Sequence, residues 1–134
     1  MSAEDNIKTI QSIYEAFGRG DVATILEGLA DDIDWGTDSA SRAAPWYGER
    51  HNKAQVGKFF EDFGSTMEVD EFTPLTFTAN DQDVQSIVKL RARVRANGNP
   101  VEMQLHHWFR FANGKIVYYR GTEDTVVVEA ALQG

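Results

Sequence analysis

The segment around His107 carries the residue types of an acid–base site. Alternate side chains of a strand share one face, so Leu105, His107 and Phe109 would lie together. That face is apolar apart from the histidine, and we expect it to line an internal pocket. Burial favours the neutral imidazole, whereas a nearby carboxylate would favour the charged form. His107 is therefore a candidate general acid, general base or oxyanion donor, the alternative being a core histidine bonded to one polar neighbour.

The side chain opposite His107 depends on the hairpin that turns at Asn113-Gly114. A three-residue loop over 112–114 pairs His107 with Tyr119, whereas a two-residue turn pairs it with Arg120. We favour the longer loop, because it places the apolar side chains of the last strand on the pocket face. In that register Tyr119 would orient the imidazole or contact a ligand, although a buried tyrosine is common in any core.

Aromatic side chains and a few acids complete the predicted pocket. Asp38 begins a loop after the first strand, and we expect it to reach the pocket and polarise a ligand together with His107 and Tyr119. The loop pair Trp46-Tyr47 would cover the pocket or lie in an interface. The remaining predicted lining residues are Tyr14, Trp35, Phe59, Phe63, Leu105, Phe109, Val117 and Glu123. Ordinary core packing is the alternative for the aromatic members in the helical half.

No motif for a metal or a cofactor is recognisable. His106 and His107 are adjacent, so on a strand their rings point to opposite faces and cannot hold one ion. His51 stands alone in a loop. The chain has no cysteine, which excludes disulfides, thiolate zinc sites and cysteine nucleophiles. A glycine-rich phosphate loop, a dinucleotide fingerprint and a Ser-His-Asp arrangement are also missing, so we expect no metal and no cofactor.

The first half of the chain has helical periodicity. Apolar side chains between Ile7 and Phe17 recur every three or four residues, and Ser2 with Asp5 resembles a capping box ahead of them. The predicted elements of this half are a helix that ends at Gly18, a second helix from Asp21 to Leu29, a short strand at 33–35, a loop over 36–52 and a third helix over about 53–64.

From Glu68 onward the apolar period changes to two, which predicts strands. The clearest alternation runs from Val84 to Ala96, and Pro74 in the preceding strand indicates an edge position or a bulge. The predicted strands cover 69–78, 84–96, about 101–111 and about 115–128. Helices followed by an antiparallel meander predict an α+β fold, with the helices on one face of a curved sheet.

The charges of the chain are unevenly spread. Residues 1–83 carry 17 acidic and 6 basic side chains, a net −11, whereas residues 84–134 carry 4 acidic and 7 basic ones, a net +3. Four of these bases share the polar face of one predicted strand: Lys89, Arg91, Arg93 and Arg95. Either this basic stripe is a solvated outer face that acids such as Glu102 partly neutralise, or it meets acids of a second copy in a homodimer.

The overall composition is that of one globular domain, which we place at residues 1–134. With 42% hydrophobic and 25% charged residues, the chain can bury one sizeable core. The net charge of −8 argues against nucleic-acid binding, which depends on phosphate neutralisation. No apolar run approaches the ~20 residues of a membrane span, and the N-terminus has no secretory signal. We therefore expect a cytoplasmic protein with no nucleic-acid and no membrane partner.

Four local motifs have a recognisable order and spacing. They are Phe17-Gly18-Arg19-Gly20-Asp21, Leu29-Ala30-Asp31-Asp32-Ile33, His107-Trp108-Phe109-Arg110-Phe111 and Gly114-Lys115-Ile116-Val117. With these motifs, nearly the whole chain resembles the nuclear transport factor 2-like superfamily, and more narrowly its SnoaL-like, ketosteroid isomerase-related branch. The resemblance implies a cone-shaped, mixed or antiparallel sheet that wraps about three N-terminal helices around an apolar pocket. It also implies a common tendency to form homodimers.

At the catalytic positions the chain departs from what the resemblance implies. The tyrosine of ketosteroid isomerases falls on Ile13, one residue before Tyr14, and their aspartate base falls on Thr37, one residue before Asp38. Their second aspartate falls on His107. A slip of one residue moves a side chain to another face of a helix or strand.

The last-strand acid of SnoaL-like cyclases and limonene epoxide hydrolase-like enzymes falls on Gly121, and the hydrolases' Arg and Asp fall roughly on Arg91 and Arg93. Two functions therefore stay open. One is a cofactor-free acid–base enzyme, of isomerase, cyclase or dehydratase type, that acts on a small hydrophobic molecule with a carbonyl group or several rings. The alternative is a non-catalytic ligand-binding or scaffold homodimer, which the missing acid at Gly121 favours.

Overall fold

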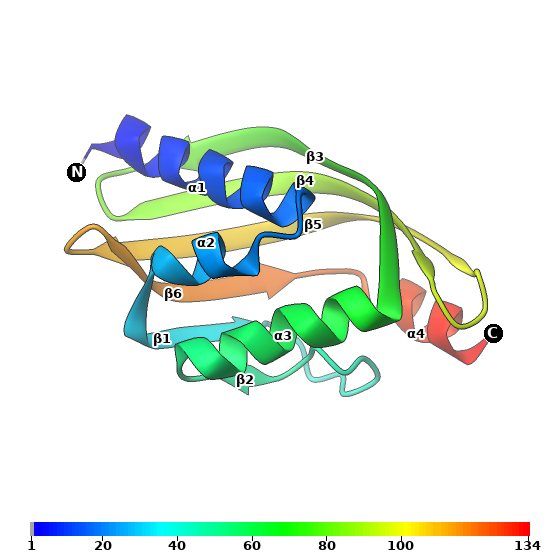
Figure 1. Ribbon diagram of the computed structural model, residues 1–134. Coiled ribbons are helices and arrows are strands. Elements are labelled where there is room, and N and C mark those ends of the chain that lie inside the picture. The colour runs from blue at the N-terminus through cyan, green and yellow to red at the C-terminus, as the bar shows by residue number, and fades with distance from the viewer. Residues whose placement is uncertain (1) are drawn as a thin grey trace.

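The computed structural model describes residues 2–134, which form four helices and six strands (Figure 1). The helices are α1 (Ala3–Gly18), α2 (Val22–Glu27), α3 (Lys53–Thr66) and α4 (Thr125–Gln133). The strands are β1 (Leu29–Thr37), β2 (Glu49–Arg50), β3 (Met67–Ala79), β4 (Asp83–Val94), β5 (Pro100–Ala112) and β6 (Lys115–Thr122). None of the helices in this part of the chain is long and apolar enough to span a membrane.

The six strands form one curved sheet in the order β2-β1-β6-β5-β4-β3. Neighbouring strands are antiparallel except for β1 and β6, which run parallel. The helices α1, α2 and α3 cover one face of the sheet, and α4 lies at the end where β4 turns into β5 (Figure 1). The predicted fold class, a curved mixed sheet around three N-terminal helices, is confirmed.

Side-chain caps begin the first two helices as predicted. The Ser2 hydroxyl accepts a hydrogen bond from the Asp5 N–H at 3.1 Å, and the Asp5 carboxylate accepts one from the Ser2 N–H at 3.3 Å. Asp21 accepts bonds from both the N–H and the hydroxyl of Thr24. These bonds satisfy donors that the first turn of a helix leaves without an intrahelical partner.

The alternation in β4 has the predicted consequence. Val88, Leu90 and their inward-facing neighbours are buried, whereas the basic side chains between them lie outside. β3 is the outermost strand on its side of the sheet, and its register shifts just after Pro74. An edge position suits proline, because the residue has no N–H to donate to a neighbouring strand.

Three of the four residues of the basic stripe have charge partners on β3 of the same chain: Lys89, Arg91 and Arg93. Glu71 lies 3.7 Å from Lys89 and 3.5 Å from Arg91, and Asp70 accepts two hydrogen bonds of 2.9 Å from Arg93. All these groups are exposed to solvent, which screens their charges, so the pairs contribute little to stability. The acidic first half of the chain thus neutralises much of the stripe without a second copy.

The C-terminal boundary of the last strand was wrong. The strand predicted over 115–128 ends at Thr122, and α4 follows. A run of three valines favours a strand, but the Asp124 carboxylate caps a helix instead, and the carbonyl of Ala131 accepts hydrogen bonds of 3.0 Å from two asparagine side chains of the β4–β5 turn. Val126 is left 72% exposed as a result.

Neither predicted register of the β5–β6 hairpin is correct. The turn has two residues, Asn113-Gly114, but the register shifts by one between Arg110 and Phe111, which inserts Val117 as an extra residue in β6. His107 therefore faces Gly121 across the strands, instead of Tyr119 or Arg120. The extra residue returns the side chains of β6 to the faces that the three-residue loop would have given them. Tyr119 and Gly121 therefore still point inward.

The boundaries around the first strand also differ from the prediction. The second helix stops at Glu27, since Leu29 already pairs with Ile116 of β6 and the Gly28 carbonyl accepts a bond from the Ile116 N–H at 2.9 Å. The predicted loop over 36–52 contains β2, two residues that pair with the end of β1. Both changes come from contacts with strands that are distant in the sequence.

Candidate functional site

A cavity of about 80 Å³ lies between the helices and the inner face of the sheet. A single buried water needs roughly 10–15 Å³, so the cavity has room for a small organic molecule. Its wall is almost entirely apolar and aromatic. The lining residues are Ile13, Tyr14, Phe17, Ile25, Trp35, Trp46, Phe59, Phe60, Phe63, Phe72, Leu90, Leu105, His107, Phe109, Tyr119 and Glu123.

His107 is the centre of a hydrogen-bonded group in this wall, in which Tyr14 and Ser86 are buried and His107 is half-buried. Its Nδ1 lies 2.7 Å from the Tyr14 hydroxyl, which in turn lies 2.5 Å from the hydroxyl of Ser86. Ser86 is the direct cross-strand neighbour of His107 on β4. Three elements, α1, β4 and β5, therefore contribute one polar group each to the same point in an apolar interior.

The local sequence explains how these groups meet. Tyr14 belongs to the buried stripe of α1 that also contains Ile10 and Ile13. Ser86 interrupts the inward row of β4, where its neighbours on the same face are apolar. The Tyr14 ring also contacts aromatic neighbours, with Phe72 packing edge-on at a centroid distance of 5.2 Å. Packing from several sides holds the hydroxyl toward the imidazole.

Both titratable members of this group are neutral at physiological pH. Burial, with a smaller contribution from the charge of His106, lowers the pKa of His107 to about 3. Burial also raises the pKa of Tyr14 well above its usual range, although the bond to Ser86 acts in the opposite sense. No charged group among residues 2–134 compensates the imidazole, so desolvation decides its charge state.

The hydrogen bonds favour one direction of donation. If Ser86 donates to Tyr14 and Tyr14 donates to Nδ1, both hydroxyl protons have an acceptor, and the proton of His107 resides on Nε2, where it stays free for a ligand. The reverse chain would leave the Ser86 hydroxyl proton without an acceptor anywhere in residues 2–134. A neutral His107 then presents an Nε2–H donor from the cavity wall.

Tyr119 supplies a second polar group to the cavity. Its ring stacks on Trp35 at a centroid distance of 4.0 Å, and its hydroxyl lies over Gly121. The residue is only 6% exposed, yet none of the hydrogen bonds in residues 2–134 involves this hydroxyl. Burial raises its pKa, and the negative charge of Glu123 adds to the effect.

Glu123 is the carboxyl that lines the cavity. The Tyr47 hydroxyl donates to Glu123 Oε2 at 2.8 Å, which fixes the loop containing Trp46 against the end of β6. Burial raises the pKa of Glu123, while hydrogen bonds from Tyr47 and Trp46 reduce that shift. The carboxyl of Glu123 therefore loses its proton at a pH closer to neutral than the carboxyl of an exposed glutamate does.

The structure brings most of the predicted site residues together, but not all of them. Ten lie in the cavity wall: Tyr14, Trp35, Trp46, Phe59, Phe63, Leu105, His107, Phe109, Tyr119 and Glu123. Tyr47 stands behind Glu123, and Val117 is the bulged residue of β6. Asp38 is exposed and is not part of the cavity wall; it lies in a second groove whose lining includes His106, His107 and Trp108.

Ser86 is the functional candidate that the sequence analysis missed. The sequence does indicate a role for Ser86, because a hydroxyl group within a row of buried apolar residues needs a hydrogen-bond partner. The identity of that partner depends on which residue of α1 lies above β4, and the sequence does not contain this information.

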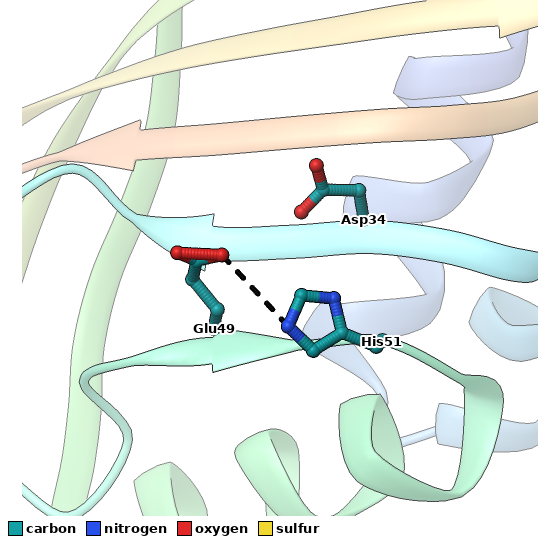
Figure 2. Close-up of side chains that lie close together, drawn as sticks. All are labelled: Asp34, Glu49 and His51. Carbon is teal, nitrogen blue, oxygen red and sulfur yellow. Dashed lines mark ion pairs between the residues drawn. The ribbon is translucent and has the colours of Figure 1, made fainter.

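A second polar cluster lies on the outer face at the β1–β2 edge (Figure 2). One potential ligand atom from each of Asp34, Glu49 and His51 lies within 4.8 Å of the others, and His51 forms an ion pair of 3.8 Å with Glu49. The guanidinium of Arg120 lies 2.9 Å from Asp34 and 4.0 Å from Glu49, so the protein's own cation already occupies this cluster, and we assign no metal to it.

Comparison with known proteins supports the fold. A family model described as a SnoaL-like domain matches residues 10–119. An NTF2-like protein of unknown function from Burkholderia pseudomallei is 24% identical over the full length of both chains, with a TM-score of 0.90. No curated protein matches the chain.

Two further solved structures have functional descriptions. A proposed isomerase from Rhodopseudomonas palustris is 20% identical, with a TM-score of 0.77 over 92% of this chain and 93% of the other. A proposed polyketide cyclase from Xanthomonas campestris is 17% identical, with a TM-score of 0.80 over 98% and 99%. At these identities the likeness shows a shared fold alone.

Proposed function

Since the chain belongs to the SnoaL-like domain family, we propose that it is a cofactor-free acid–base enzyme for a small, largely apolar molecule that contains a carbonyl group. The proposed reaction is of isomerase, cyclase or dehydratase type, in which negative charge develops on a carbonyl oxygen. The observation that carries the proposal is the 2.7 Å hydrogen bond between Tyr14 and His107 in the wall of a largely apolar cavity.

The charge state of His107 determines whether it can act as a general base or as a hydrogen-bond donor to an oxyanion. An imidazole whose pKa is about 3 is a weak base at neutral pH, because its protonated form is strongly disfavoured. As a neutral Nε2–H donor it can instead stabilise an oxyanion, and a dry, preoriented donor is worth more than the same group in water. Tyr14 holds the imidazole in this tautomer through Nδ1.

Hydrogen exchange of a ketone tests this chemistry without knowledge of the natural substrate. 2-Tetralone is bicyclic and apolar, and it exchanges the protons next to its carbonyl through an enolate. In D₂O we expect the protein to accelerate this exchange, as followed by NMR, and we expect His107→Gln to lose most of the acceleration. His106→Gln is the matched control, since this neighbouring imidazole points to the outer face. Equal rates with the protein, with His107→Gln and with buffer would contradict the proposal.

The alternative is a non-catalytic ligand-binding or scaffold protein. The observation that favours it is that His107 has no carboxylate partner within the described residues, so no charged group raises its basicity. If 2-tetralone shifts NMR resonances of residues in the cavity wall but does not exchange faster than in buffer, this second function is supported.

A further inference from the structure

Enolate formation needs a base that takes a proton from carbon, and His107 does not suit this task. Its Nδ1 is engaged by Tyr14, and its pKa of about 3 makes the imidazole a weak base at neutral pH. The phenols of Tyr14 and Tyr119 keep their protons, because burial raises the pKa of both hydroxyl groups. Glu123 is the one carboxyl group that lines the cavity in the described part of the chain.

The register of the sheet places Glu123 close to His107. Gly121 is the direct cross-strand partner of His107 on β5. Glu123 lies two residues beyond Gly121, which corresponds to roughly 6.6 Å of extended chain. His107 and Glu123 also line the same cavity. Over this distance, a carbonyl oxygen can accept from Nε2 of His107 while the carbon next to the carbonyl lies beside the carboxylate.

Two side-chain donors hold the Glu123 carboxylate at the cavity wall. The Tyr47 hydroxyl donates to Oε2 at 2.8 Å, and Trp46 donates a further hydrogen bond. A carboxylate can accept about four hydrogen bonds, so the two donors leave it able to take up a proton. Burial raises the pKa of Glu123, which makes the carboxylate a stronger base. The residue is only partly buried, so the proton that it takes up can exchange with water.

We propose that Glu123 is the general base that deprotonates the carbonyl compound bound at His107. The inference deepens the proposed function, on which it rests, because it names the residue that accepts the proton. The carboxylate takes a proton from the carbon next to the carbonyl group. The electron pair of that C–H bond forms the C=C bond of an enolate, and the carbonyl π pair moves to the oxygen, which accepts from Nε2–H of His107. The carboxylic acid then returns a proton to carbon, and the carbonyl group re-forms.

The transfer leaves the net charge of the cavity unchanged. A single negative charge resides first on Glu123 and then on the enolate oxygen. A ligand with a carboxylate of its own would add a second negative charge to a largely apolar cavity, which carries a large desolvation cost. The expected substrates are therefore uncharged ketones or aldehydes with a hydrogen on the carbon next to the carbonyl group.

Deuterium exchange of 2-tetralone tests the base with a matched pair of variants. Glu123→Gln keeps the shape of the side chain and can accept from Tyr47, but its amide takes up no proton. We expect this variant to bind 2-tetralone as the unchanged protein does, by NMR titration, and to lose on the order of 100-fold of the acceleration. Glu129→Gln makes the same change in α4, where the carboxylate accepts from Ser41 at 2.7 Å outside the cavity wall, and should keep the rate.

The pH profile of the exchange separates a base from a structural residue. After subtraction of the buffer rate, the rate of the unchanged protein should rise as Glu123 loses its proton and become constant above its pKa, and Glu123→Gln should lack the rise. The imidazole and the phenols of the wall keep their charge between about pH 4 and 8. Because the bond from Tyr47 lowers the pKa of Glu123, Tyr47→Phe should move the midpoint to higher pH. The neighbouring carboxylates are engaged elsewhere, Asp124 at the N-terminus of α4 and Glu129 with Ser41.

Several results would overturn this role of Glu123. If the acceleration is lost in His107→Gln but persists in Glu123→Gln, the base is wrongly assigned and the proposed function stands. The assignment is also wrong if Glu123→Gln loses rate only because it no longer binds 2-tetralone, or if Tyr47→Phe leaves the midpoint unchanged. If the unchanged protein does not accelerate the exchange, the base and the proposed function fail together. The ¹H–¹⁵N spectrum of each variant shows whether it is folded, and the Tyr47→Phe profile decides if Glu123→Gln is not.

Discussion

The hydroxyl of Tyr14 lies 2.7 Å from Nδ1 of His107, although the two residues are 93 positions apart in the chain. This bond joins the first helix to a central strand and fixes which nitrogen of His107 remains free. A buried, neutral imidazole with one nitrogen engaged can offer only the other nitrogen to a ligand. The orientation of α1 on the sheet therefore decides the chemistry that the cavity can perform.

The tautomer of His107 is directly measurable. In the unchanged protein we expect long-range ¹H–¹⁵N spectra to show a proton on Nε2, because Nδ1 accepts from Tyr14. Ser86→Ala should preserve this tautomer, since Tyr14 can still donate to Nδ1. Tyr14→Phe should produce a mixture of the two tautomers. A proton on Nδ1 in the unchanged protein would reverse the direction of donation and make Nε2 an acceptor.

Burial of a neutral His107 predicts a pH-dependent stability. The pKa falls from 6.5 in the unfolded chain to about 3 in the folded protein, so between these values the unfolded state binds more protons. The free energy of unfolding should therefore decrease as the pH falls through this window, by up to about 1.4 kcal/mol per pH unit. His107→Gln lacks this contribution.

Urea unfolding of both proteins at pH 7, 6, 5 and 4 measures the effect as a difference. The stability of the unchanged protein relative to His107→Gln should decline steadily below pH 6.5. Contributions of other groups, including the raised pKa of Glu123, are common to both proteins and cancel. A constant difference over the whole series would mean that the imidazole is not held neutral by burial.

Gly121→Ala tests the packing of Tyr119. The new methyl group would collide with the tyrosine hydroxyl, and we expect a loss of about 1–3 kcal/mol in the free energy of unfolding. Combining it with Tyr119→Phe should recover part of the loss, because the colliding oxygen is gone. Gly64→Ala in α3 is the control, since nothing lies within 4 Å of its new methyl group and a gain in stability is expected. If the losses of stability caused by Gly121→Ala and by Tyr119→Phe simply add in the double variant, residues 119 and 121 do not touch.

The outer face of the sheet remains our proposed homodimer interface. We expect light scattering to give twice the chain mass of 15.0 kDa, and Arg93→Glu to give a single chain. That change removes the partner of Asp70 and places a fourth acid beside the three acids of β3. Lys8→Glu on the exposed side of α1 makes the same change in charge and should leave the dimer intact. A dimer that survives Arg93→Glu would argue for an assembly through another face.

The elements that could be predicted from the sequence are those whose cause is local. The period of two in β4 and the capping box at Ser2 depend on residues close together in the chain, and both are found as expected. His107 was assigned to the pocket face for the same reason, because alternation alone places it beside Phe109. Local patterns therefore identified the residue at the centre of the candidate site.

The errors have a common physical origin in tertiary contacts. The three valines of α4 favour a strand by themselves, and only the docking of the helix against the β4–β5 turn overrides that preference. The bulge at Val117 has no mark in the sequence, so at His107 the register from the two-residue turn was wrong by one residue and that from the three-residue loop by two. Asp38 was placed in the cavity by its position after β1, but it lies in a second groove beside the cavity and not in the cavity wall.

The parallel pairing of β1 with β6 has a consequence for the timing of assembly. β6 is made near the end of synthesis, yet it lies in the middle of the sheet, between a strand made early and the β3–β4–β5 meander. Until about residue 122 has emerged from the ribosome, β1 has only the two-residue β2 as a neighbour, and the two halves of the sheet have no strand to join them. A nascent chain that already contains Tyr14 and His107 therefore has no enclosed cavity, and a site completed by such distant contacts is expected to form slowly.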